Sequence, residues 1–67
     1  MLKEIRKNDI TLYNALKWLE NNDYSIISID NTSVLLFDKE FRYTLLLTKE
    51  NIKERYKAHC EDLKDLA

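Results

Sequence analysis

The spacing of apolar residues changes along the chain and divides it into helical and extended segments. Leu12, Ala15, Leu16 and Leu19 recur at helical spacing and fall within about 100° of one another on a helical wheel. This stripe predicts an amphipathic helix. Its start is expected to be capped by Asp9 or Thr11, whose side chains accept bonds from free N–H groups. Its end is expected at residues 21–23, Asn-Asn-Asp, which tolerate the left-handed conformation.

The residues before this helix continue its apolar stripe, but two polar residues interrupt the stripe. Met1, Leu2 and Ile5 lie in phase with the stripe, whereas Asn8 and Asp9 project onto it. We therefore expect a kink, or a separate N-terminal turn or arm over residues 1–8.

The middle of the chain is rich in β-branched and aromatic residues, which are typical of strands. Three runs, Tyr24–Ile29, Val34–Phe37 and Phe41–Leu47, are separated by short polar clusters. These dividers are too short for a crossover helix, so the runs predict an antiparallel meander. A last helix is expected to begin after Thr48 as N-cap. Its apolar face consists of Ile52, Tyr56, His59, Cys60, Leu63 and Leu66.

These elements predict a single α+β domain over residues 1–67, in the order helix, three strands, helix, with both helices mainly on one sheet face. This order is similar to that of the double-stranded RNA-binding domain. The basic run that begins the last helix of that family is replaced here by residues 49–54, Lys-Glu-Asn-Ile-Lys-Glu. The family's glycine-containing loop between strands also has no counterpart here. The resemblance is therefore limited to the order of elements and does not imply RNA binding.

The predicted sheet carries large apolar residues on both faces, because successive strand residues point to opposite sides. In the third run, Phe41, Tyr43, Leu45 and Leu47 share one face, which we expect to be the core. The other face is expected to present Tyr24, Ile26, Leu46 and one apolar pair from the middle strand. A patch of that kind usually signals a binding site. Either another chain covers it, or the N-terminal segment does, through Leu2 and Ile5.

The first predicted helix carries a second stripe, formed by Ile10, Asn14 and Trp18 at spacings of four. Trp18 is either an interface residue, as its large rigid ring favours, or a residue at the edge of the core. The candidate interface residues are thus Trp18, Ile10, Tyr24, Ile26 and Leu46.

The length and composition favour self-association. A chain of 67 residues with one cysteine has no internal disulfide to supplement its small core. We therefore expect a homo-oligomer, with a dimer favoured. The sequence contains no membrane-spanning run and no signal-like apolar block at its start, so the expected location is cytoplasmic. The abundance of lysine, asparagine and isoleucine, without glycine or proline, suggests a phage or other mobile element.

Positive and negative residues are nearly balanced, both over the whole chain and within its segments. The formal net charge is −1, and no segment is strongly basic. The footprint that drives nucleic-acid affinity is therefore missing, which makes nucleic acid an unlikely partner.

The residues that could carry catalysis are too few or wrongly placed. His59 and Cys60 are adjacent on a helix and diverge, and one histidine with one cysteine cannot form a metal site. The acidic residues of the last segment alternate with lysines as surface pairs. We therefore expect no enzyme, cofactor or metal. The sequence predicts a non-catalytic protein-interaction module, such as an inhibitor or regulator. The alternative is a nucleic-acid-binding accessory protein.

Overall fold

The chain folds into three helices and three strands, in a computed structural model that describes residues 2–66 and the side chains of residues 3–63. In chain order the elements are α1 (Leu2–Asn8), α2 (Ile10–Glu20), β1 (Tyr24–Ile29), β2 (Ser33–Asp38), β3 (Tyr43–Thr48) and α3 (Lys49–Leu66).

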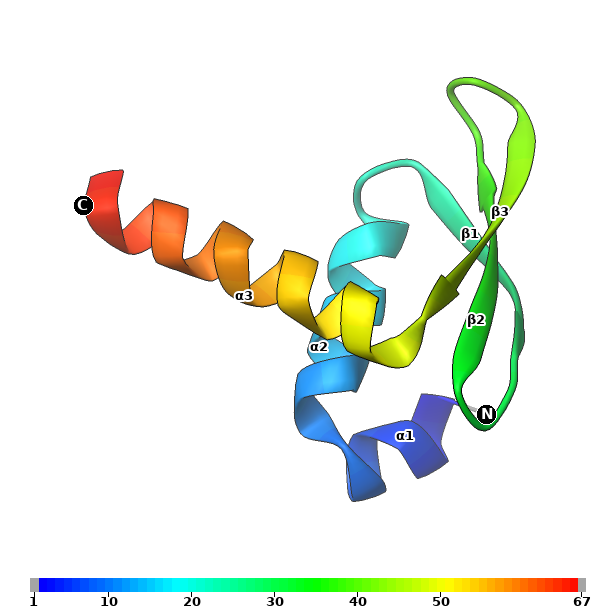
Figure 1. The fold of residues 1–67 in the computed structure, drawn as a ribbon, viewed down its shortest axis with the longest axis horizontal. Helices are drawn as coiled ribbons and strands as arrows, with labels where there is room; N and C mark the ends of the chain where they lie inside the picture. The colour runs from blue at the N-terminus through cyan, green and yellow to red at the C-terminus, as the bar shows by residue number, and fades with distance from the viewer. Residues whose placement is uncertain (1, 67) are drawn as a thin grey trace.

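The three strands form an antiparallel meander in the order β1-β2-β3. Figure 1 shows the sheet on one side of the molecule and the helices gathered on the other, so the described helices cover one sheet face and none of them lies on the opposite face. We call this opposite side the outer face. The predicted α+β class and element order are confirmed.

The core lies between α2, the covered face of the sheet and the start of α3. Among the described residues it consists of seven buried apolar side chains, namely Leu12, Ala15, Leu16, Leu19, Val34, Leu36 and Ile52. The predicted stripe of α2 thus supplies four of the seven. A core of this size leaves a chain of 67 residues with a small margin of stability.

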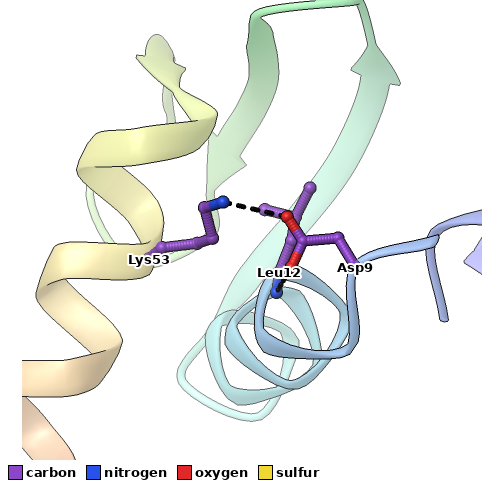
Figure 2. A network of polar contacts seen from close by, with 3 residues as sticks. All are labelled: Asp9, Leu12 and Lys53. Carbon is purple, nitrogen blue, oxygen red and sulfur yellow. Dashed lines mark hydrogen bonds and ion pairs between the residues drawn. The ribbon is translucent and has the colours of Figure 1, made fainter.

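Asp9 separates α1 from α2 and fixes the start of α2. Its Oδ1 accepts the backbone N–H of Leu12 at 3.1 Å, as expected of an N-cap. Its Oδ2 accepts a hydrogen bond from Lys53 Nζ of α3 at 2.9 Å (Figure 2). One carboxylate therefore starts α2 and joins it to α3. The interruption predicted at residues 8 and 9 is present.

The turns explain where the strands begin and end. Asp23 has a φ of 68°, so the expected left-handed residue follows α2. After β2, the buried Asp38 accepts the backbone N–H groups of Glu40 and Phe41 through Oδ1, at 2.9 and 3.1 Å. Arg42 closes this turn with a φ of 58°. The turn therefore extends to residue 42, and β3 begins at Tyr43 instead of the predicted Phe41.

The last helix begins as predicted and then leaves the body of the protein. Thr48 Oγ1 accepts the backbone N–H of Asn51 at 3.1 Å. Figure 1 shows α3 turning away from the sheet at the end of β3, with its C-terminal part projecting beyond the other elements. Leu63 there is 54% exposed. The side chain of Leu66 lies outside the described part of the chain.

Candidate interaction surface

The outer face of the sheet carries the main candidate site. Paired residues of an antiparallel sheet share a face, so Leu35, whose partners are Ser28 and Leu46, marks the outer side together with Phe37. Leu46 is 63% exposed, and Leu35 and Phe37 are partly exposed. We call Leu35, Phe37 and Leu46 the outer patch.

The paired strand positions of the outer face, all within the described residues, carry no charged side chain. Around the outer patch these positions are serine and threonine, namely Ser25, Ser28, Ser33, Thr44 and Thr48. Hydroxyl side chains cost little to desolvate compared with ionised ones. The face therefore combines exposed apolar area with an absence of charge that would oppose burial.

A β-bulge in β1 changes which residues face outward. The register shifts between Ile26 and Ser28, which leaves Ile27 without a partner. Ile27 is 48% exposed, whereas Ile26 and Ile29 both pack against the core. The prediction that Ile26 lies on the outer face is therefore wrong, because strict alternation fails at a bulge.

Tyr24 is also not on the outer face. It pairs with Asp38 and packs against the core, on the same side as Ile26. The middle-strand pair that points outward is Leu35 and Phe37, which settles the choice that the sequence left open.

The predicted core face of the third strand is only partly buried. Leu45 and Leu47 pack against the core as expected. Phe41, however, is 70% exposed and Tyr43 is 50% exposed. Phe41 lies in the turn that Asp38 organises, outside the strand. Sequence periodicity placed Phe41 in the core because it continued the strand through the turn. Tyr43 is in the strand, on the covered side opposite Asp38, but at its start.

The N-terminal segment does not cover the outer patch through Ile5. Ile5 packs against the core cluster, and α1 contacts α2. Figure 1 places α1 on the same side of the sheet as the other helices. The side chain of Leu2, the other expected cover, lies outside the described part. Leu46 remains exposed in this arrangement.

The side chain of Trp18, a residue of α2, packs against α3 at the edge of the core. Its ring stacks on His59 with centroids 4.8 Å apart and an interplanar angle of 26°. It also meets Tyr56 at 5.8 Å and 51°. Trp18 is partly buried and packs against the core, which corresponds to the core-edge alternative. Ile10, from the same predicted stripe, is 54% exposed.

His59, which stacks on Trp18, is the one histidine of the chain, and Cys60 beside it is the one cysteine. Both side chains are partly exposed. A hydrogen bond with the Cys60 thiol, together with desolvation, raises the pKa of Tyr56. Within residues 2–66, no group of three or more His, Cys, Asp and Glu side chains is placed to hold a metal ion.

Two surface hollows lie near the start of α3. One, of about 350 Å³, is lined by Asn31, Thr32, Thr48, Lys49 and Glu50. The other, of about 470 Å³, reaches from Asn31 and Lys49 to α1 and Asp9. Among the described side chains, no buried nitrogen or oxygen lacks a hydrogen-bond partner. Neither hollow is therefore marked by a buried side-chain nitrogen or oxygen without a partner among the described residues.

Comparison with protein-family models, with curated proteins and with solved structures gave no match. None of the helices within residues 2–66 combines the length and apolar character needed to cross a membrane. The functional argument therefore depends on the surface of this chain alone.

Proposed function

We propose that this protein is a small non-catalytic interaction module that self-associates at the outer patch. The observation that carries the proposal is the exposure of Leu46, 63%, beside Leu35 and Phe37 on an uncharged sheet face. Burying a leucine of this kind contributes about 1.5–3 kcal/mol when its full side chain leaves water. The protein acts by occupying a surface, with no reaction turned over.

A second copy of the chain is the occupant that the physical chemistry favours. An uncharged face brings no like charges together when it meets its own copy. The core of seven apolar residues also leaves association as the available supplement to stability, since Cys60 has no partner for an internal disulfide. A self-associated module of this kind suits an inhibitor or regulator that binds another protein.

The proposal is tested by measuring mass with light scattering at micromolar concentrations. We expect a mass twice that of the 8.1 kDa chain. Leu46→Asp should reduce it to that of one chain, because a buried carboxylate at the interface is costly. The matched control is Leu63→Asp on the projecting part of α3, where the replaced leucine is 54% exposed, and it should leave the mass unchanged. A wild-type monomer at all concentrations would contradict the proposal.

A further inference from the structure

The outward edge of β3 has backbone hydrogen-bonding groups that no other strand uses. β3 pairs only with β2, so it forms one edge of the sheet. The N–H of Lys49 donates to the carbonyl of Thr32 at 2.8 Å, one pair beyond the end of the β2–β3 register. Bonded and non-bonded pairs alternate along an antiparallel ladder. The backbone groups of Thr44 and Leu46 therefore face away from β2.

This edge lacks the features that normally prevent strands from pairing. From Tyr43 to Thr48 it has no charged residue, no proline and no bulge. The opposite edge, β1, is interrupted by the bulge at Ile27. Figure 1 shows that α3 turns away from the sheet after β3 and does not run along it. The molecule therefore has one regular edge and one interrupted edge.

Half of the exposed large hydrophobic side chains among the described residues lie at this edge. Phe41, Tyr43 and Leu46, on β3 or in the turn before it, are 70%, 50% and 63% exposed, and the other three, Ile10, Ile27 and Leu63, lie on α2, β1 and α3. On a strand edge, such residues are available to pack across to a neighbouring strand.

We propose that two copies of the chain pair antiparallel through their β3 edges and form one six-stranded sheet. This inference rests on the proposed self-association and places its contact at the β3 edge. Of the outer patch, Leu46 lies at the paired edge, whereas Leu35 and Phe37, on the middle strand, stay on the open face of the six-stranded sheet. A two-fold axis at Leu45 places Thr44 opposite the partner's Leu46 and satisfies the free backbone groups of both. The same register brings Tyr43 beside the partner's Leu47 on the covered side, where Tyr43 is otherwise half exposed.

A second copy suits this edge better than an unrelated strand for two reasons. An uncharged strand meets its own copy without repulsion, and a two-fold axis lets the same groups donate and accept on both sides. Because the bulge interrupts the other edge, pairing stops at two chains. Edge pairing also differs from packing two outer faces together, which would leave the β3 backbone groups unpaired.

Hydrogen exchange of the wild-type protein tests the pairing directly. The amides of Thr44 and Leu46 should exchange rapidly in dilute solution. They should exchange about fivefold more slowly at a total chain concentration about ten times the dissociation constant, because exchange requires the free chain and about a fifth of the chains are then free. The amides of Leu45 and Leu47 face β2 and serve as controls that are protected throughout. A dimer in which Thr44 and Leu46 exchange at concentration-independent rates would overturn edge pairing and leave the proposed function standing. A monomer would overturn both.

Disulfide formation supplies a second test, in a Cys60→Ser background. Cα atoms of a hydrogen-bonded antiparallel pair lie about 5.5 Å apart, within the range that a disulfide bridges. The double variant Thr44→Cys/Leu46→Cys should therefore give a covalent dimer on oxidation. Leu35→Cys, on the middle strand, should remain uncross-linked, because three strand spacings of about 4.8 Å would separate the two copies. The reverse pattern would indicate face-to-face packing and overturn the inference.

Discussion

Asp38 is the one buried charged residue among those described, and it holds the turn before β3. It is 5% exposed, and its Oδ1 accepts the N–H groups of Glu40 and Phe41. Replacing Asp38 with alanine should lower the free energy of unfolding by about 1–3 kcal/mol, because both donors lose their acceptor. Asp38→Asn keeps a carbonyl oxygen at this position and should lose less. Urea unfolding of the two variants checks this, and equal losses would contradict it.

At the scale of residues, the helix caps were predictable and the turn was not. Asp9 and Thr48 accept N–H groups in the first turns of their helices, as their residue types indicate. Arg42 adopts a φ of 58°, a conformation that arginine does not favour and that its sequence position does not signal. The expected third strand therefore ran two residues too far toward the N-terminus, and Phe41 was assigned to the core.

At the scale of elements, helical periodicity predicted more than strand alternation did. The stripe of α2 is buried as expected, because a helix keeps its period between its caps. In β1 a single unpaired residue, Ile27, shifts the register. The residues after it therefore point to the opposite side from the one that strict alternation predicts. Nothing in the run Ser-Ile-Ile-Ser marks the bulge, so Ile26 was placed on the wrong face. The outer position of Leu46 was predictable because β3 pairs with β2 without interruption.

The ion pair that joins the N-cap of α2 to α3 depends on the ionised form of Asp9. A hydrogen bond from Lys53, and then one from the N–H of Leu12, lower the pKa of Asp9 from its ordinary value of 3.8. A lowered pKa in the folded state means that the carboxylate stabilises the fold fully above pH 3.8. This contribution is lost as the pH falls from 3.8 through the folded-state pKa.

Asp9→Asn should therefore make stability less dependent on acid pH. Asparagine keeps the cap, so the variant removes mainly the pair with Lys53, whose two side chains are 30% and 37% exposed. We expect a loss of about 0.2–1 kcal/mol at neutral pH that shrinks as the pH is lowered below 3.8. Urea unfolding across this range measures it. A difference between Asp9→Asn and wild type that stays constant across this pH range would contradict the assignment.

At the scale of the whole molecule, the two faces of the sheet differ in what they pack against. The covered side contains the residues that hold the helices, and the outer side and the β3 edge contain apolar groups with no described cover. Lys53, one of the lysines of α3, is paired with Asp9. The expectation that nucleic acid is not a partner stays a prediction. The surface thus favours association through uncharged groups over electrostatic attraction.

The stability of the fold should then depend on association, and therefore on protein concentration. A fold with a core of seven apolar residues has little stability in reserve, and pairing adds free energy that depends on concentration. The thermal midpoint of the wild-type protein should rise when its concentration is raised a hundredfold. Leu46→Asp should unfold at a lower midpoint that does not change with concentration, although it removes no core contact. Leu63→Asp should keep the concentration dependence of the wild type. Scanning calorimetry at two concentrations measures all three, and a wild-type midpoint independent of concentration would show that the fold stands without a partner.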